Sequence, residues 1–282
     1  MPPTLLEEPR VIAAVRRIEL DIAHDHQLTE LAQACGLSAF HFHRLFADVM
    51  GETVSGFLRR QRLDASAIRL AATEMSMLEI GTSAGYGSLA AFSRAFQRQF
   101  GIPPTVYRPA ARAAVPPVEP LHFALAEKVR LDRWDAPPLI GLRFFGGYDQ
   151  VEQHWCRFAE EVRNRLGLDP DKLEPYALIR DNPEITPQGL IRYDCCFADP
   201  GGLPDSLPAP FSRLPMQIRR CATLAHNAPY LEVFPAYRAI ANVWTAQHGE
   251  YFAEAPAMER YHAPPWRHVG EAQAFTIMVM LL

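Results

Sequence analysis

Two segments of the chain carry an arginine at the same position of a short, serine-capped pattern. In SAFHFHRLF, the helix predicted after Ser38 carries Arg44, and in SLAAFSRAF, the helix predicted after Ser88 carries Arg94. Serine is a preferred N-cap because its hydroxyl accepts a hydrogen bond from a free N–H group of the first turn. Arginine binds guanine O6 and N7 through two hydrogen bonds and also clamps phosphate. Each arginine could therefore bond a base edge or clamp a phosphate, and its repetition at the same helix position strengthens the pattern.

Each capped helix completes a helix-turn-helix pattern. A short helix precedes it and ends in a tight turn, at residues 35–37 in the first copy and at 85–87 in the second. A helix over about 53–72 connects the copies and another over 10–24 precedes them, because apolar residues recur there at helical spacing. We therefore predict an all-α N-terminal domain with two helix-turn-helix modules joined by a helix.

The text SAFHFHRLFADVMGETVSGFLRRQRLDAS, followed by GYGSLAAFSRAFQRQFGIPPTVYR, resembles the DNA-binding domain of AraC/XylS-type transcription regulators over about residues 8–108. In that family both second helices enter adjacent major grooves, which lie about 34 Å apart on one face of the DNA. The resemblance implies double-stranded promoter DNA and RNA polymerase as partners. The residues expected at the DNA are the caps and outward positions of the two helices: Ser38, Ala39, Phe40, His41, His43, Arg44, Ser88, Leu89, Ala90, Ser93 and Arg94.

The two helices differ in what they offer to DNA. Phe40 can contact a thymine methyl group, and both serines can meet phosphates at helix N-termini. Leu89 and Ala90 carry no hydrogen-bond donor in their side chains, which favours shape-based or nonspecific readout by the second helix. Gly81, inside a predicted helix, costs about 1 kcal/mol relative to alanine, so we expect it to loosen the second module.

Two patterns in this region suggest other chemistry and are rejected. His41 and His43 are two positions apart, and such residues point to different sides of a helix instead of sharing a metal ion. Residues 81–85 match Gly-x-Ser-x-Gly, but a hydrolase needs a strand before that motif and this stretch is predicted to be helix and turn. We expect no metal site, no cofactor and no catalytic residues here.

Composition supports two globular domains and limits the class of protein. The chain has 282 residues, 49% of them hydrophobic, and its net charge of −4 divides into +1 for residues 1–112 and −5 for the remainder. No run of about 18 apolar residues is present, so we expect no membrane-spanning helix. The N-terminus lacks the pattern of a signal peptide, and the five cysteines show no Cys-x-x-Cys spacing. These features predict a cytoplasmic protein with reduced thiols.

Prolines mark a boundary between the domains. Six of them fall between Pro103 and Pro120, and proline removes a helical hydrogen bond, so we expect no helix to continue through this stretch. The predicted organisation is a DNA-binding domain at 1–110, a Pro-rich linker at 111–124 and a second domain at 125–282.

The second domain repeats itself after a shift of 82 residues. The shift places Tyr148 on Tyr230 and Trp155 on Tyr237, and it also aligns two glycines that follow the predicted helices. Each copy has the pattern strand, helix, strand, strand. We therefore predict an α+β domain made of a duplicated β-α-β-β unit, with an antiparallel sheet and two helices.

This layout resembles the GyrI-like effector-binding domain over about residues 125–282, on the motifs GGY, APY, YALIRDNPEITP and MERY. The resemblance implies a small-molecule effector, with bulky lipophilic cations as the known ligand type and a glutamate that meets the charge. Glu259 matches that glutamate. In a strand, Glu259 and Tyr261 share one face, and the first copy has Ala177 at the equivalent position.

The residues expected at the ligand are Glu259, Tyr261, Tyr148, Tyr230 and Trp155. Structural alternatives stay open for two of these residues. Glu259 could instead be an ordinary exposed strand residue or a partner of Arg260. Trp155 could instead belong to the core stripe of its helix. The expected function is a ligand-responsive DNA-binding transcription regulator. As alternatives, the second domain hydrolyses reactive small molecules with Glu259 as base, or it sequesters drugs and DNA binding is vestigial.

Overall fold

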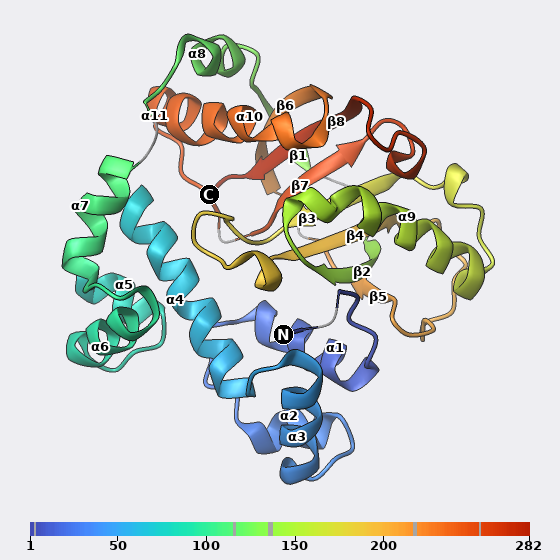
Figure 1. Ribbon diagram of the computed structural model, residues 1–282, viewed down its shortest axis with the longest axis horizontal. Helices are drawn as coiled ribbons and strands as arrows, with labels where there is room; N and C mark the ends of the chain where they lie inside the picture. Colours follow the sequence, from blue (N-terminus) through green and yellow to red (C-terminus); the bar gives the residue numbers. More distant parts are fainter. Residues whose placement is uncertain (3, 115–116, 135–137, 217–218, 254) are drawn as a thin grey trace. The chain divides into compact units, whose positions relative to one another are not determined.

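The computed structural model describes residues 1–2, 4–114, 117–134, 138–216, 219–253 and 255–282 (Figure 1). The chain divides into two compact units. The main part of the first, here called the helical unit, is Glu8–Pro117, and the main parts of the second, here called the sheet unit, are Val118–Pro183 and Pro187–Leu282. Within the described residues, no helix has the length and apolar character needed to cross a membrane.

The helical unit contains only α-helices among its described elements, as predicted. They are α1 (Pro9–Leu20), α2 (Leu28–Ala34), α3 (Ala39–Met50), α4 (Val54–Ala72), α5 (Met77–Ser83), α6 (Leu89–Phe100) and α7 (Pro104–Ala114). Helices α2 and α3 form one helix-turn-helix module, α5 and α6 form the other, and α4 connects them (Figure 1). With 19 residues at 1.5 Å each, α4 is about 28 Å long.

The local signals of both modules are present in the structure. The Ser38 hydroxyl accepts a hydrogen bond from the His41 N–H at 3.3 Å, and the Ser88 hydroxyl accepts one from the Ala91 N–H at 3.2 Å. Glycine with a positive φ ends each of the two helices, as glycine allows without steric cost. The caps fix where α3 and α6 begin and therefore which of their residues face outward.

Gly81 has a packing role that the sequence pattern did not predict. The residue is buried in α5, and a Cβ atom added to it would lie 3.1 Å from Cβ and Cγ of Phe92 in α6. The missing side chain allows the two helices to approach closely. This close packing against Phe92 acts against the unfavourable helix propensity of glycine, and the loosening of the module stays a prediction.

The prediction that prolines prevent helix formation over 103–120 is wrong. Pro104 begins α7, and Pro120 begins α8 (Pro120–Ala126), a position where the missing N–H costs nothing. Pro109 lies inside α7, which side-chain contacts hold against α4: the Arg112 guanidinium donates to the carbonyl oxygens of Thr73 at 2.6 Å and Ala71 at 3.3 Å. Two helices thus occupy part of the predicted linker at 111–124.

The sheet unit has the predicted duplicated organisation. Its strands and main helices, besides α8, are β1 (Arg130–Trp134), β2 (Leu139–Phe145), α9 (Val151–Glu161), β3 (Pro175–Ile179), β4 (Arg192–Ala198), β5 (Ser212–Leu214), β6 (Arg219–Ala228), α10 (Phe234–Arg238), α11 (Thr245–His248), β7 (Ala257–Tyr261) and β8 (Gln273–Met280). π-Helical segments, η2 (Val162–Leu166) and η6 (Ala239–Trp244), extend α9 and join α10 to α11. The α+β prediction is confirmed.

The described strands form one antiparallel sheet in the order β1-β6-β8-β7-β3-β4-β2-β5. The two copies meet at the centre, where β3 pairs with β7. The repeat pattern did not predict the two edge strands, and each pairs with the other copy. Strand β1 precedes the first copy in the chain but pairs with β6 of the second copy, and β5 precedes the second copy but pairs with β2 of the first. This exchange joins the copies into one sheet.

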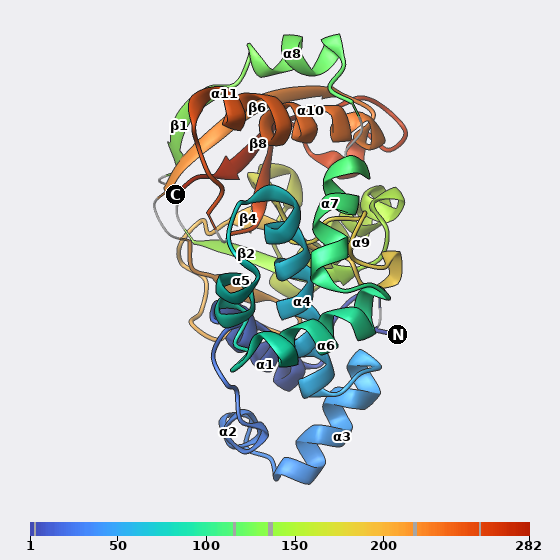
Figure 2. The same cartoon turned by 90° about the vertical axis from the view of Figure 1, so that its left-hand side faces the viewer.

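The two faces of the sheet carry separate apolar clusters. On one face, α9 and the α10–α11 helix cover a core that includes Trp155, Ile240 and Phe275. The other face carries a second cluster that includes Tyr176 and Met258. Helix α8 packs against α10 and η6 from outside (Figure 2). Residues of β7 therefore alternate between two buried environments.

We expect Gly81→Ala to give no gain in stability, although alanine favours a helix by about 1 kcal/mol. The added methyl group would lie 3.1 Å from the Phe92 side chain, which is 0% exposed, so Phe92 must shift to accept it. Hydrogen exchange of the α5 and α6 amides measures the local free energy of opening. As a control, Ala65→Gly in the middle of α4 should cost about 1 kcal/mol or more. Stronger protection in Gly81→Ala would contradict the close contact.

Candidate DNA interface and ligand site

The outer side of α3 presents the predicted residues to solvent. The helix packs into the core through Phe42 and Phe46, whose ring centroids lie 6.0 Å apart. On the opposite side the Phe40 side chain is 67% exposed and accessible to a thymine methyl group. Ala39 is half-buried, and the remaining positions are exposed: Ser38, His41, His43 and Arg44.

Helix α6 presents the equivalent surface. Phe92 and Phe96 are buried, whereas Ser88, Leu89, Ala90 and Arg94 are exposed and Ser93 is half-buried. The outer side also carries exposed Gln97, four residues after Ser93 and three after Arg94, and exposed Arg98. Sequence reasoning missed Gln97, although its helical spacing places it between these residues. Its amide is of the type that can bond adenine, a chemistry that Leu89 and Ala90 lack.

The arginines of the helical unit fall into two groups. Arg60 bonds Glu52 at 2.6 Å, and the Arg62 guanidinium donates to backbone carbonyls, including that of Ile22 at 2.6 Å. Arg44 and Arg94 have no hydrogen bond or ion pair with any described residue. Two exposed guanidinium groups at equivalent positions are thus free to bind an external anion or base edge.

Glu259 lies at the centre of the sheet, on the helix-covered side. Its backbone partner across the β3–β7 pair is Ala177, the same residue that the repeat aligns with it. The Glu259 side chain is 0% exposed, and the small Ala177 side chain leaves room for it. The interpretation as an exposed strand glutamate is wrong. The partner interpretation is also wrong, because Arg260 lies on the other face and donates to Glu174 at 2.7 Å.

Four tyrosine hydroxyls surround the Glu259 carboxylate. Tyr261 and Tyr193 donate to Oε2 at 3.0 and 3.2 Å, while Tyr237 and Tyr230 donate to Oε1 at 3.1 and 3.3 Å. An ionised carboxylate accepts about four hydrogen bonds, so these hydroxyls use its whole capacity. We call Glu259 and these four tyrosines the tyrosine cage.

The environment changes the ionisation of the cage. Burial raises the pKa of Glu259 to about 7, and the four tyrosine hydrogen bonds oppose this rise. Burial also raises the pKa of each cage tyrosine well above its usual value, so the hydroxyls stay neutral donors. Near pH 7 the carboxyl group is therefore poised between its neutral and charged forms.

Two residues expected at the ligand lie at the edge of the cage. The Tyr148 hydroxyl donates to the Asp181 backbone carbonyl at 2.6 Å and has no hydrogen bond to Glu259 in the described structure; its ring lies 6.3 Å from Tyr193. Trp155 is fully buried in the core and packs edge-on against Tyr261, with ring centroids 5.0 Å apart. Trp155 thus packs against the ring of the cage residue Tyr261 and has no hydrogen bond to Glu259 in the described structure.

Sequence reasoning missed two members of the cage, Tyr193 and Tyr237. The shift of 82 residues aligns Tyr193 with Phe275 and Tyr237 with Trp155, so both occupy positions that read as core. The signal was a difference between the copies: at each of these positions only one copy carries a phenol. The same kind of difference, Ala177 against Glu259, identified the carboxylate.

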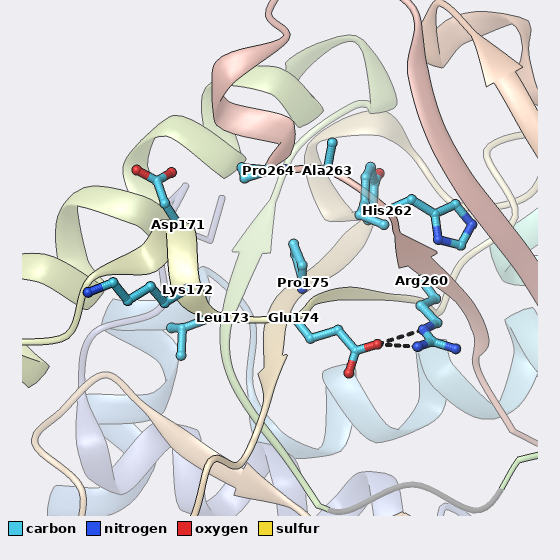
Figure 3. A pocket seen from close by; sticks show the side chains of 10 residues that line it. Asp171, Lys172, Leu173, Glu174, Pro175, Arg260, His262, Ala263 and Pro264 are labelled. Atoms are coloured by element: carbon cyan, nitrogen blue, oxygen red, sulfur yellow. Dashed lines mark hydrogen bonds and ion pairs between the residues drawn. The ribbon is translucent and has the colours of Figure 1, made fainter.

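A cavity of about 370 Å³ lies where β3 and β7 stop pairing, and Tyr261 is one of its ten lining residues (Figure 3). Its charges are already compensated: Glu174 pairs with Arg260, and Asp171 accepts hydrogen bonds from Arg267. The bonds from Arg267 lower the pKa of Asp171 to about 2. The Glu174 and Asp171 carboxylates at this cavity are therefore already paired with arginines, whereas Glu259 has no arginine partner.

Two capped helices with exposed arginines in one unit, and a buried carboxylate in a duplicated α+β domain in the other, define a DNA-binding protein with a small-molecule-binding domain. Residues 31–110 match the family model of a helix-turn-helix domain, and residues 127–280 match that of a GyrI-like small molecule binding domain. The chain belongs to the AraC/XylS regulators that carry a GyrI-like domain.

Curated relatives and solved structures match part of the chain. The right origin-binding protein of Escherichia coli (strain K12) is 32% identical over 119 residues, which are 41% of this chain and 41% of that protein. The match thus spans less than half of that relative. The regulatory protein SoxS of the same strain is 36% identical over 78 residues, which are 28% of this chain and 73% of SoxS. The solved DNA-binding domain of the transcriptional factor AdpA, in complex with a target DNA, is 26% identical with a TM-score of 0.37, covering 39% of this chain and 98% of that one.

The buried carboxyl group predicts a pH dependence of stability. Folding raises the pKa of Glu259 from 4.5 to about 7, so the folded protein retains a proton that the unfolded chain releases. This contribution to stability is complete below pH 4.5, is lost as the pH rises to about 7, and amounts to about 3 kcal/mol. Glu259→Gln should therefore gain about that much relative to the native protein between pH 4.5 and 8.

Urea unfolding followed by tryptophan fluorescence measures this difference, because all four tryptophans lie in residues 134–266, within the sheet unit. Glu160→Gln, an exposed change on α9, serves as the control and should follow the native pH profile. Parallel pH profiles of Glu259→Gln and the native protein would show that Glu259 titrates normally in the fold.

Proposed function

We propose that the chain is a ligand-responsive transcription regulator that binds promoter DNA through α3 and α6 and takes a small organic cation at the tyrosine cage. The observation that carries this proposal is the pairing, in one chain, of two exposed reading helices and a buried carboxylate ringed by phenols. We further propose cytoplasmic action, contact with RNA polymerase and the division at 1–110, 111–124 and 125–282.

The DNA-binding part of the proposal rests on the surfaces of α3 and α6. Ser38 and Ser88 are N-caps whose hydroxyl protons remain available to phosphates. Arg44 and Arg94 follow six residues after each cap and have no partner in the described structure. This pairing supports two equivalent readers of successive major-groove segments, and it speaks against a vestigial DNA-binding domain.

The sensing part rests on the chemistry of the tyrosine cage. A cation near a carboxylate and aromatic faces gains both a charge interaction and cation–π contacts, each of the latter contributing about 0.5–2 kcal/mol. A ligand changes the activity of a regulator only if it binds two states of the protein with different affinity. Glu259 is fully enclosed in this state. An opened state that exposes the cage would therefore be the one that a cation selects.

Hydrolysis is the second candidate, and the pKa of Glu259 favours it as a general base near neutral pH. We nevertheless propose sensing, because tyrosine hydroxyls occupy all four acceptor positions that a base would use to activate water. Consumption of a reactive small molecule in proportion to time, abolished in Glu259→Gln, would instead identify an enzyme.

Arg44→Ala and Arg94→Ala should each weaken binding to DNA that the native protein selects from a random pool. A lost base contact removes about 1–3 kcal/mol of discrimination at one or two base pairs, whereas a lost phosphate contact lowers affinity for all sequences and reduces the salt dependence. Gel-shift titration at two salt concentrations separates these outcomes. Arg163→Ala, an exposed change in the sheet unit, is the control; equal binding by all four proteins would refute the assigned helices.

Glu259→Gln should lower the affinity for tetraphenylphosphonium by tenfold or more, since it removes the charge but keeps the shape of the side chain. Isothermal titration calorimetry measures the dissociation constant, and Glu160→Gln is the matched control on the surface. DNA affinity without ligand should stay unchanged. Native-like affinity of Glu259→Gln for tetraphenylphosphonium would overturn the sensing site.

A further inference from the structure

Besides Trp155, whose indole Nε1 is also unpaired, three buried side chains close to the tyrosine cage have polar atoms without a hydrogen-bond partner in the described part of the chain. They are His154 at both ring nitrogens, His226 at Nε2, and Gln273 at both its amide oxygen and nitrogen. The residues are 1%, 8% and 2% exposed, respectively, so bulk water does not satisfy them. Leaving such a group unpaired costs about 1–3 kcal/mol, and native structures rarely tolerate it without a reason.

These side chains lie on both flanks of Glu259. His154, on α9, stacks on Phe144 at 4.8 Å and lies 6.1 Å from the cage residue Tyr193. On the other flank, the His226 ring on β6 lies 4.7 Å from Phe275, which in turn lies 4.8 Å from the cage residue Tyr261. The His154 ring thus lies next to a cage tyrosine, and the His226 ring is separated from one by the Phe275 ring.

Gln273 belongs to the second flank. It lies on β8 two residues before Phe275, and therefore on the same, helix-covered face of the sheet. Strand β6 carries His226 and is two strands from β7 in the sheet. On the other side of β7, strand β2 carries Phe144, the ring on which His154 stacks, and is three strands from β7. At about 4.8 Å per strand, the two flanks reach roughly 10 and 14 Å from the strand of Glu259.

Both imidazoles are neutral at physiological pH. Burial lowers the pKa of His154 to about 4 and also lowers that of His226. A neutral imidazole does not repel a cation, and it offers one donor and one acceptor. The amide of Gln273 likewise offers both. The flanks are therefore packed, largely apolar surroundings that contain a few neutral, unpaired hydrogen-bonding groups, and such groups fix the orientation of a polar ligand where a site opens to admit it.

We infer that the ligand of the sheet unit is an elongated organic cation whose charge meets Glu259 and whose two ends carry neutral hydrogen-bonding groups, such as amides, hydroxyls or amines, that pair with His154 on one flank and with His226 and Gln273 on the other. The inference rests on the proposed cation site. A purely apolar cation leaves all three side chains unpaired, so the site discriminates against it in favour of a cation with polar ends.

The test compares two singly charged probes in the full-length protein. Tetraphenylphosphonium has no hydrogen-bonding group, whereas procainamide carries an ammonium, an amide and an arylamine. His154→Phe keeps the ring stacked on Phe144, and Gln273→Met keeps the length of the side chain. Procainamide carries its amide and arylamine on one side of its ammonium, so with the charge at Glu259 it reaches one flank. One of the two substitutions should therefore lower its affinity about 2- to 10-fold, the effect of one neutral hydrogen bond, and both should leave the affinity for tetraphenylphosphonium within twofold.

Unchanged procainamide affinity in both variants would overturn the inference and assign the three side chains to enclosed water. Binding of tetraphenylphosphonium but not procainamide to the native protein would overturn it as well. If neither probe binds, or if Glu259→Gln binds tetraphenylphosphonium normally, the proposed cation site itself fails.

A measurement on the native protein covers the case in which a variant does not fold. The ¹⁵N chemical shifts of the histidine ring on the flank that procainamide reaches, His154 or His226, should change in the direction of a new hydrogen bond, and both rings should keep their shifts with tetraphenylphosphonium. Equal changes with both probes would contradict the inference.

Discussion

The site of the sheet unit depends on one buried carboxyl group, that of Glu259, which lies where the two copies of the duplicated domain meet. Ala177 and Glu259 are equivalent positions of the two copies, and they are also direct partners across the β3–β7 pair. Two glutamates here would place like charges side by side in a dry core, which strongly disfavours ionisation of both. Fusion of the copies into one chain allows one position to hold alanine and the other glutamate. The tyrosines then supply donors that a lone buried carboxylate requires.

The parts of the fold that follow from short-range chemistry were predictable. Serine caps, glycine ends and helical spacing depend on neighbours within one or two turns, and α3 and α6 begin where Ser38 and Ser88 place them. Predictions failed where distant residues decide. Pro109 is accommodated in a helix whose Arg112 bonds the end of α4, and the packing role of Gly81 depends on Phe92 in the next helix. Neither contact is visible in a local pattern.

The same distinction explains which site residues were found. Glu259 and Tyr261 share a strand face, so their proximity follows from a period of two residues. Tyr193 and Tyr237 come from β4 and α10, and only the folded sheet brings their hydroxyls to the carboxylate. As single residues they fit a core stripe. In a duplicated domain, a polar group that is present in one copy and absent from the other is the more sensitive signal, because a shared core needs no such difference.

The cage also constrains what kind of ligand can bind. Four phenols already satisfy Glu259, so a cation that enters must replace some of these bonds and, near pH 7, compete with a proton for the same carboxyl group. Charge alone therefore yields a modest net gain, since the attraction is offset by lost hydrogen bonds and desolvation of the cation. Selectivity then depends on groups around the carboxylate that gain partners only when the ligand is present. His154, His226 and Gln273 are such groups, because they are enclosed and unpaired while the cage is closed.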